Sequence, residues 1–389
     1  MPSTTKGTRN KDRGRSGHYV RQPAGYSAFI PTPLPPNPAI RMAGELQVLL
    51  SDATLALGRL DGSIQTLPNP ELFVLMYVRK EAVLSSQIEG TQSSLEDVLA
   101  AEAKILETTV PRDVDEVINY VRAMNHGIAR LKQLRVSVRL IRELHERLLT
   151  GVRGSHSTPG EVRRSQNWIG SHSALLKDAT FVPPPPAEVP RALGDLEKFL
   201  HSDSKLPLLV QIGLAHAQFE TIHPFLDGNG RIGRLLITFL LCERGVLQKP
   251  VLYLSHFFKQ HRPEYYERLQ ETRDNGNWEG WLEFFLLGVR EVSVQATETA
   301  RKILALREDH RNAIAEHLGR AAGNGHKVLE ALYRRPILNV NAIKDITGTS
   351  FTAANDLVLR LTRLGILEEI TNRRRNRSFR YEQYIELFS

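Results

Sequence analysis

The segment 223–234, near the middle of the 389-residue chain, gathers residue types that bind phosphates and transfer protons. It contains His223, Asp227, Gly228, Asn229, Gly230, Arg231, Ile232, Gly233 and Arg234. Two glycines within three residues let the backbone approach a ligand closely and turn its N–H groups towards it. A helix that begins at about residue 229 would add a partial positive charge and free N–H donors, which favour an anion.

The two arginines of this segment strengthen the case for an anion. Arg231 and Arg234 would lie in the first turn of the helix, where each cation costs ~0.3–1 kcal/mol unless an anion joins it. A polyphosphate would give both guanidinium groups bidentate partners, and carboxylates of the chain itself are the structural alternative. Asp227 could then hold Mg2+ against the phosphates, and His223 could act as a base near neutral pH.

Helical patterns lie on both sides of this segment. Apolar residues recur at spacings of three and four over 208–222, which predicts an amphipathic helix. Residues 235–242 are apolar on nearly every side, so the helix that follows the segment should be central and buried. Upstream, proline and glycine signals predict a helix over 70–89, and a capping box at 93–96 predicts the start of the next one.

We expect little β-structure. The runs 167–170 and 179–182 are short, β-prone and followed by prolines, so they indicate a small hairpin. Residues 25–40 are rich in proline and predict an extended strap on the body. Residues 1–24 predict a disordered basic tail, because residues 1–15 hold five lysines and arginines against one aspartate. A nucleic-acid-binding arm is the alternative for this tail.

The pattern changes near residues 310–325, where the small residues 321–325 predict a hinge. Helix, turn, helix and hairpin patterns follow over 325–389, and this order is that of a winged helix. Four arginines at the predicted wing would suit contacts with DNA phosphates, namely Arg373, Arg374, Arg375 and Arg377. A protein-docking or dimer-supporting module fits the same pattern.

Composition narrows the class of protein. The chain has 41% hydrophobic and 24% charged residues, which is ordinary for a globular protein. Cys242 is the single cysteine, so an internal disulfide framework and a cysteine-rich zinc site are excluded. No run of ~18 apolar residues predicts a transmembrane helix, and the N-terminus lacks the apolar stretch of a secretory signal. We therefore expect a cytoplasmic protein without a membrane partner.

The string from His223 to Arg234 resembles the signature of the Fic family, HxFx(D/E)GNGRxxR, at every defined position. The resemblance extends over residues 25–310. It implies a mainly α-helical fold with an N-terminal helical region (25–115), a catalytic core (116–310) with a small β-hairpin flap, and then the winged helix. It also implies transfer of AMP from ATP to a Ser, Thr or Tyr hydroxyl of a target protein, the chain itself included.

The resemblance implies a role for each residue of the signature. His223 would deprotonate the target hydroxyl, Asp227 would ligate Mg2+, and Arg234 would contact the γ-phosphate. Other contacts to ATP would come from Glu89, Gly228, Asn229, Gly230, Arg231, Ile232, Gly233, Tyr265 and Tyr266. The flap would align an extended target segment by strand pairing, through Asn167, Trp168, Ile169 and Gly170. Core packing is the alternative for the two tyrosines, and Arg273 stands where some relatives place an asparagine near the nucleoside.

Ser85, Glu89 and Gly90 fit the inhibitory pattern of the family, (S/T)xxxE(G/N). The resemblance implies that Glu89 pairs with Arg234 and so occupies the group that the γ-phosphate needs. Ser85 lies four residues before Glu89 and would face the same side of the helix. ATP bound against this restraint would be misaligned, and a shift of ~1 Å can cost ~100-fold in rate.

Three classes of function stay open at this point. The leading one is a protein adenylyltransferase that uses ATP and Mg2+ and is inhibited by its own glutamate. The second is a Fic variant that removes AMP or transfers phosphate, and the third is a winged-helix DNA-binding regulator with the Fic core as its sensor. The expected partners are the target protein, a second copy of the chain as in dimeric relatives, and nucleic acid at the C-terminal domain.

Overall fold

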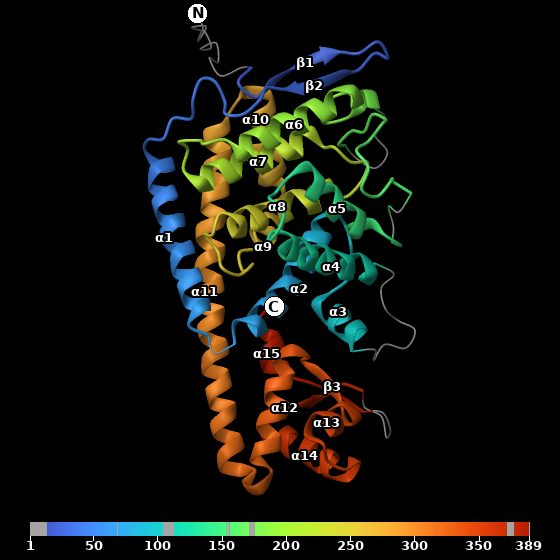
Figure 1. Ribbon diagram of the computed structural model, residues 1–389, viewed down its shortest axis with the longest axis vertical. Helices are drawn as coiled ribbons and strands as arrows, with labels where there is room; N and C mark the ends of the chain where they lie inside the picture. Colours follow the sequence, from blue (N-terminus) through green and yellow to red (C-terminus); the bar gives the residue numbers. More distant parts are fainter. Residues whose placement is uncertain are drawn as a thin grey trace, which may run out of the picture.

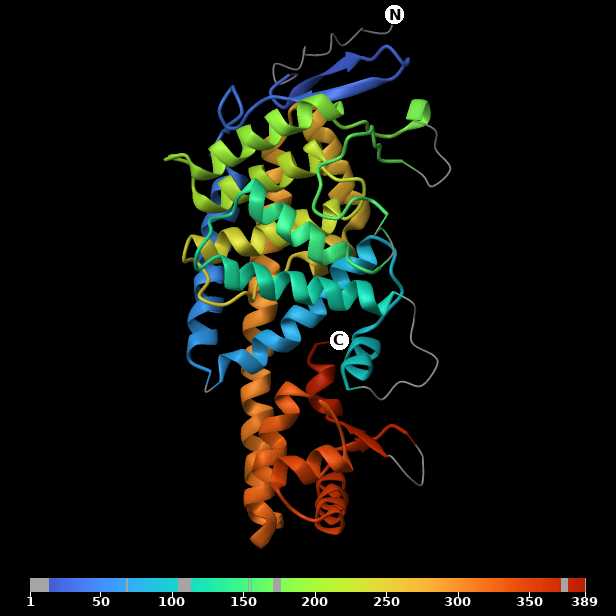
Figure 2. The same ribbon diagram turned by 45° about the vertical axis from the view of Figure 1, so that its right-hand side comes forward.

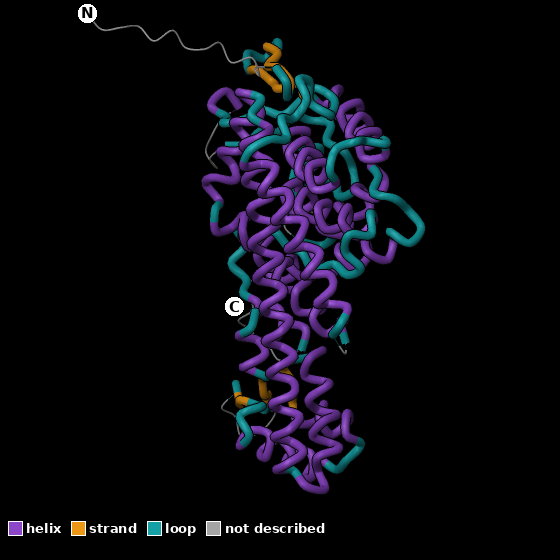
Figure 3. The backbone as a smooth tube through the Cα atoms, turned by 90° about the vertical axis from the view of Figure 1, so that its left-hand side faces the viewer, coloured by secondary structure: helices purple, strands orange, loops and turns teal. Residues whose placement is uncertain are grey.

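The computed structural model describes residues 14–67, 69–103, 113–152, 154, 156–170, 176–371 and 377–388. Within these ranges the chain forms an elongated, mainly helical molecule, so the predicted mainly α fold class is confirmed. Stacked helices make a large body, and residues 319–388 make a smaller domain at one end (Figure 1). A two-stranded sheet lies at the opposite end from the three-stranded sheet of the smaller domain (Figure 3).

The large body is built from two strands and eleven α-helices within the described ranges, together with two short 3-10 helices at Leu176–Asp178 and Pro186–Glu188. The strands and α-helices are β1 (Gly17–Arg21), β2 (Ser27–Pro31), α1 (Glu45–Gln65), α2 (Pro70–Ile88), α3 (Leu95–Glu102), α4 (Val114–Arg130), α5 (Val138–Leu149), α6 (Val189–His201), α7 (Leu208–Ile222), α8 (Asn229–Glu243), α9 (Ser255–Gln260), α10 (Arg262–Asn275) and α11 (Trp278–His317). The last of these, α11, runs along the body and continues into the C-terminal domain (Figure 2).

Helices α7 and α8 lie against each other at the centre of the body and flank the segment 223–228. As the sequence predicts, α8 is buried along almost its whole length. Helix α11 packs against α1 and α7, and its Trp281 is fully buried. The Trp281 indole nitrogen donates a hydrogen bond to the Gly213 carbonyl oxygen of α7 (2.8 Å), which fixes α7 on the long helix.

Part of the N-terminal region that the sequence predicts to be disordered is ordered in the structure. Residues 1–13 lie outside the described residues, but Gly17–Arg21 of the predicted tail forms β1, which pairs antiparallel with β2. Arg15 anchors this region, because its Nη1 lies 2.8 Å from a Glu279 carboxylate oxygen and its Nε donates to the Pro38 carbonyl (2.9 Å). Partners distant in the sequence thus order residues whose local composition predicts disorder.

The predicted hairpin at 167–182 is reduced to a single antiparallel bridge in the described residues. Ile169 and Phe181 exchange two backbone hydrogen bonds, of 2.8 and 3.1 Å. Residues 171–175 between them lie outside the described residues. The Phe29 N–H of β2 donates to the Val182 carbonyl (2.9 Å), so the N-terminal hairpin supports this flap.

The C-terminal domain follows the predicted order of elements. It contains α12 (Ala322–Arg334), β3 (Ile337–Asn339), α13 (Val340–Thr347), α14 (Phe351–Arg363), β4 (Glu368–Glu369), β5 (Ser378–Arg380) and α15 (Glu382–Glu386), with the antiparallel strand order β3-β5-β4. The predicted hinge at 321–325 is wrong, because these residues complete a tight turn and begin α12. A side chain at Gly325 would collide with Leu318 and Ile314, which explains the glycine by close packing.

The four arginines of the predicted wing are not equally placed. Arg373, Arg374 and Arg375 lie outside the described residues. Arg377 is engaged within its own domain, since its Nη2 donates to the Asn355 side-chain oxygen (2.5 Å) and its Nη1 lies 3.4 Å from Glu369. Contact of this domain with DNA therefore stays a prediction.

Helix α2 begins at Pro70 as predicted and ends at Ile88, next to the predicted stop. The capping box of α3 lies one residue later than predicted. Ser94 and Asp97 form it, and the Ser93 hydroxyl instead bonds the carboxylate of Asp113. Within the described ranges, no helix combines the length and apolar character needed to cross a lipid bilayer.

Candidate active site

Hydrogen bonds within the loop between α7 and α8 fix its conformation. His223 ends α7 in the left-handed region (φ 47°), and Gly228 precedes α8 in the same region (φ 79°). Asn229 closes the loop: its Oδ1 accepts from the Phe225 N–H (2.8 Å) and its Nδ2 donates to the Phe225 carbonyl (2.8 Å). A left-handed residue other than glycine costs energy that surrounding contacts must balance, and such residues concentrate at functional sites.

Two residues outside the signature brace the same loop. Arg163 is buried, its Nε donates to the His223 carbonyl (2.9 Å), and its backbone N–H donates to the Pro224 carbonyl (2.9 Å). Asn167, which the sequence places in the flap, donates its Nδ2 to the Phe225 carbonyl (2.8 Å). The flap and the loop are therefore tied together, and the orientation of the His223 backbone depends on both.

His145 of α5 packs against the loop between α7 and α8 and bonds to it. Its ring stacks on Phe225, with 3.7 Å between centroids and 7° between planes. Its Nδ1 accepts from the Gly160 N–H (2.9 Å), so the proton lies on Nε2, which donates to the Asp227 carbonyl (3.0 Å). Burial lowers the pKa of His145 to about 4, which keeps the ring neutral in this role. The sequence gives no signal for this residue, because a lone histidine within a helical pattern is common.

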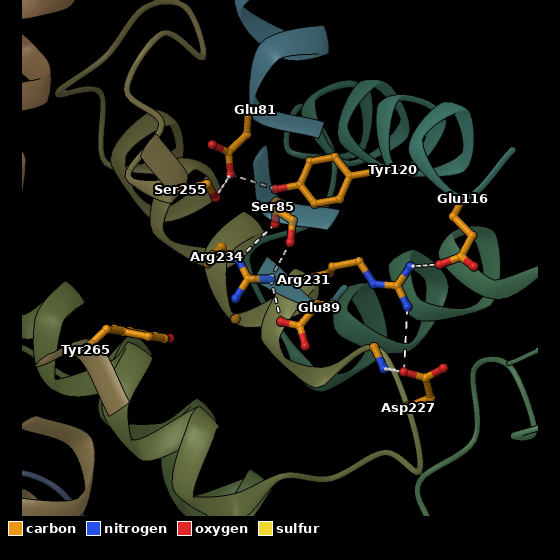
Figure 4. Close-up of polar contacts among 12 residues, drawn as sticks. Glu81, Ser85, Glu89, Glu116, Tyr120, Asp227, Arg231, Arg234, Ser255 and Tyr265 are labelled. Carbon is orange, nitrogen blue, oxygen red and sulfur yellow. Dashed lines mark hydrogen bonds and ion pairs between the residues drawn. The ribbon is translucent and has the colours of Figure 1, made fainter. Parts of the chain in front are cut away.

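Arg234 is the buried cation at the centre of the site (Figure 4). Its Nη2 donates to the Glu89 carboxylate (2.7 Å) and to the Ser85 carbonyl (2.9 Å), and its Nε donates to the Ser85 hydroxyl (2.8 Å). Glu89 follows the end of α2 and reaches over Gly230, where any side chain would collide with its carboxylate. A carboxylate of the chain thus occupies the positive end of α8, where the sequence predicts a bound anion.

Glu89 and Arg234 each stabilise the charged form of the other. Burial alone would raise the pKa of Glu89, but the Arg234 guanidinium opposes it and holds the pKa below its ordinary value. Glu89 is therefore ionised at neutral pH, and Arg234 carries its positive charge at a position that is almost fully buried. The predicted pairing of these two residues is present in the structure, and Ser85 joins it from the same side of α2.

Arg231 is used differently from Arg234. Its buried Nη1 donates to Glu116 of α4 (3.2 Å), and its Nη2 lies 3.6 Å from the Asp227 carboxylate. Both arginines therefore pair with carboxylates of the chain, as the structural alternative predicts, and Arg231 in addition holds the loop against α4. Glu116 lies 115 positions earlier in the chain, so no local pattern points to this pair.

Asp227 is the residue at this site that fits a metal ion. Its side chain is 42% exposed, and its Oδ1 accepts from the Gly228 N–H (2.6 Å). The described residues hold no cluster of three or more metal-ligating side chains. Mg2+ is commonly bound through one or two carboxylates together with substrate phosphates. Asp227 thus suits a cation shared with a nucleotide, and the part of the chain that the structure describes adds no further ligands that would complete a metal site by themselves.

The imidazole of His223 lies among cations. Burial and the Arg273 and Arg163 guanidinium groups lower the pKa of His223 to about 4, so the ring is neutral at pH 7 and can accept a proton. Its Nδ1 is buried and has no hydrogen-bond partner among the described residues. An incoming polyphosphate would counter the arginine charges and raise this pKa towards neutrality.

Two buried glutamates near Arg234 are not predicted from the sequence. Glu81 of α2 accepts hydrogen bonds from the hydroxyls of Tyr120 (3.0 Å) and Ser255 (2.5 Å) (Figure 4). Burial raises the pKa of Glu81 to about 7 and the pKa of Glu220 in α7 to about 7. A glutamate within a helical pattern carries no local sign of such burial, so sequence reasoning could not select either one.

The two tyrosines have different positions. Tyr265 is buried, and its hydroxyl bonds the Nε2 of His216 (2.9 Å), whose Nδ1 bonds the Gly233 carbonyl (2.9 Å). Tyr265 therefore packs in the core, as the alternative predicts, and His216 is buried beside it. A contact of Tyr265 with ATP stays a prediction. Tyr266 is 37% exposed, and the Arg262 guanidinium carbon lies 5.2 Å from the centre of its ring.

Arg273 links the flap to α7. Its guanidinium carbon lies 3.9 Å from the centre of the Phe181 ring, and its Nε donates to the Thr221 hydroxyl (3.2 Å). In the flap itself, Ile169 forms the bridge described above, and the Trp168 side chain is 43% exposed beside it.

Comparison with known proteins identifies the family. The description "Fic/DOC family N-terminal" matches residues 47–129, and "Fic/DOC family" matches residues 135–241. These matches contain Glu89 and Arg234, the two ends of the ion pair. The chain belongs to the Fic/DOC family.

Several relatives carry names that describe an activity. The protein adenylyltransferase Fic of Drosophila ananassae is 33% identical over 186 residues, which cover 46% of this chain and 32% of that protein. A probable protein adenylyltransferase of Aquifex aeolicus is 30% identical over 183 residues, which cover 46% of this chain and 52% of that protein. The chain thus spans about a third to a half of the length of these curated relatives.

Solved structures show a similar fold. A Fic family protein from Desulfovibrio desulfuricans superposes with a TM-score of 0.58 at 20% identity, over 88% of this chain and 97% of that one. A Fic domain-containing signaling protein from Bacteroides thetaiotaomicron gives a TM-score of 0.52 at 19% identity, over 67% of this chain and 96% of that one. At these identities the likeness concerns the fold alone.

Proposed function

We propose that this protein transfers AMP from ATP to a hydroxyl group of a protein side chain, and that Glu89 inhibits the transfer. The Arg234 cluster carries the proposal: a buried guanidinium at the N-terminus of α8 is held by a carboxylate, beside a loop that presents a neutral imidazole. Such a site binds an anion and offers a proton acceptor next to it, which nucleotidyl transfer requires. The names of the relatives support AMP as the transferred group.

The proposed reaction is an in-line displacement at phosphorus. The target hydroxyl oxygen attacks the α-phosphorus, a P–O bond forms to it, and the bond from the α-phosphorus to the bridging oxygen breaks, so that pyrophosphate leaves. His223 takes the hydroxyl proton. Arg234 and the free N–H groups at the start of α8 stabilise the charge that develops on the phosphates. Asp227 would hold Mg2+, which when bound supplies further positive charge there.

The flap would align the target. An extended segment of the target that pairs with the backbone near Ile169 would be held by main-chain hydrogen bonds, which demand little of its side chains. Asn167 and Arg163 tie this part of the chain to the carbonyls of the His223 loop. A hydroxyl on the paired segment would in this way be positioned relative to the imidazole.

Two differently labelled forms of ATP test the proposal. The Glu89→Gln variant is incubated with target-containing lysate and ATP labelled at either the α- or the γ-phosphate. We expect the α-label on protein, with a mass increase of one AMP, and the γ-label in pyrophosphate. Protein that carries the γ-label would instead indicate phosphate transfer, and loss of AMP from a prelabelled protein would indicate removal of AMP.

The matched control keeps the site and removes the base. His223→Ala in the Glu89→Gln background should bind ATP, as measured by calorimetry, but should not label protein. Transfer by this double variant at an undiminished rate would contradict the role given to His223.

A further inference from the structure

A cavity of about 550 Å3 lies between the large body and the C-terminal domain. Its walls come from α2, the start of α3, α9, and the residues of α15 and just after it. The volume falls within the range of ~300–1,000 Å3 that is usual for small-molecule sites. The loop of His223 contributes none of the lining residues, so this cavity is separate from the candidate active site.

Much of the lining is apolar. Val83 and Leu84 of α2 and Leu95 of α3 contribute aliphatic side chains, and Ile385 and Phe388 contribute side chains from the C-terminal end of the described chain. Phe388 also packs edge-on against Tyr77 of α2, with ring centroids 5.4 Å apart, so this wall is held in place. The apolar lining suits an aliphatic or aromatic body in the ligand.

The polar part of the lining contains two lysines, a histidine and one glutamate besides neutral side chains. Lys80, His256 and Lys259 face the cavity from α2 and α9. Among the described residues no carboxylate lies within ion-pair distance of the Lys80 ammonium, and burial lowers the pKa of Lys80. Burial and then the charges of Lys80 and Lys259 lower the pKa of His256, so both lysines lie near this ring, which is neutral at pH 7. Glu96 also lines the cavity, and its carboxylate lies 3.5 Å from the Arg380 guanidinium, which offsets its negative charge.

We propose that this cavity binds a small organic anion with an apolar body, such as a carboxylate with an aliphatic chain. The anionic head would lie among Lys80, His256 and Lys259 and would accept hydrogen bonds from the two ammonium groups. The apolar chain would lie against Leu84 and Phe388. Because a single ligand would then touch α2, α9 and the residue Phe388 after α15, it would strengthen the junction between the body and the C-terminal domain. The proposal does not depend on AMP transfer.

Two lining residues, Lys259 and Gln87, would change partners when an anion binds. The Lys259 ammonium donates to the Gln87 side-chain oxygen (2.6 Å), and the Gln87 amide nitrogen donates to the Ser93 carbonyl (2.9 Å). Lys259 is exposed and its present partner is neutral. An anion would offer it a charge-assisted bond, which is the stronger kind.

Calorimetry with octanoate tests the site on the full chain. We expect saturable binding of one octanoate per chain, together with much weaker binding of octan-1-ol, which lacks the charge, and of acetate, which lacks the chain. Lys80→Gln keeps most of the stem but removes the charge, and it should weaken octanoate binding at least tenfold. Lys302→Gln on the exposed surface of α11 is the matched control and should leave the affinity unchanged.

The same experiment can overturn the proposal. No saturable binding of octanoate, equal affinity for octan-1-ol, or unchanged affinity in Lys80→Gln would each do so. If Lys80→Gln does not fold, Lys259→Gln replaces it, because Lys259 is exposed and its loss leaves the packing intact. This variant should weaken octanoate binding severalfold, and an affinity equal to that of the unaltered chain would count against the site.

Discussion

Replacing Glu89 with glutamine should release Arg234 for a phosphate while keeping the shape of the site. In the structure the Arg234 Nη2 donates to the Glu89 carboxylate at 2.7 Å, and two further bonds from the same guanidinium go to Ser85. Glutamine preserves the side-chain length and one acceptor oxygen, but it removes the negative charge that a γ-phosphate would have to displace. The Ser85 bonds should persist and keep Arg234 in place.

The magnitude follows from the strength of this one interaction. A hydrogen bond with a charged partner contributes ~1.5–3 kcal/mol. The Glu89 side chain is 33% exposed, and solvent screening favours the lower end of that range. At ~1.4 kcal/mol for each factor of ten, the transfer rate should rise ~10-fold at limiting ATP.

The assay measures initial rates of self-labelling with α-labelled ATP at concentrations well below saturation. Glu298→Gln is the control, because Glu298 lies on the exposed face of α11 and pairs with Lys302 at 2.9 Å, far along the chain from the site. We expect the control to match the unaltered protein. Equal rates for Glu89→Gln and the unaltered protein, both folded, would refute the reasoning about Arg234.

Three further predictions concern other parts of the site and the fold. His223→Ala in the Glu89→Gln background should lose transfer but keep ATP affinity within a few-fold by calorimetry, since the imidazole moves a proton and holds no phosphate. Glu220, whose pKa burial raises from 4.5 to about 7, binds a proton in the folded state that the unfolded chain has released, so stability should fall as the pH rises from about 4.5 to 7. Glu220→Gln should flatten part of that slope in melting temperatures measured across this window, and an unchanged slope would argue against a protonated Glu220. Trp281→Ala should lower the free energy of unfolding by ~3–5 kcal/mol in urea titrations, because it empties a buried site and removes the indole hydrogen bond to the Gly213 carbonyl.

The sequence predicts those parts of the site that local patterns determine. The start of α8 next to Gly228, the end of α2 next to Glu89, and the burial of 235–242 all follow from caps, glycines and periodicity. The pairing of Glu89 with Arg234 was expected from a family pattern rather than from physics, since 145 positions separate the two residues. A local pattern contains no information about partners so far apart.

Other features depend on tertiary contacts and could not be predicted. The Asn229 side chain closes the loop on Phe225, and the Arg231 guanidinium contacts a glutamate of α4. No local pattern indicates either contact, and a contact of these residues with ATP stays a prediction. The capping box of α3 was misplaced by one residue because Ser93 and Ser94 are equivalent in the pattern, and the more distant Asp113 decides between them.

The continuous helix α11 has a consequence for how the two ends of the molecule communicate. Its 40 residues correspond to about 60 Å of straight helix. One end is anchored through Trp281, and the other meets the C-terminal domain, where the His310 Nδ1 lies 2.7 Å from the Tyr381 hydroxyl. A partner bound to the C-terminal domain would be held at a fixed distance and orientation from the large body, because α11 is a continuous helix and not a flexible linker. The position of a hydroxyl on that partner would then decide whether it reaches the imidazole, as much as the amino acids around the hydroxyl.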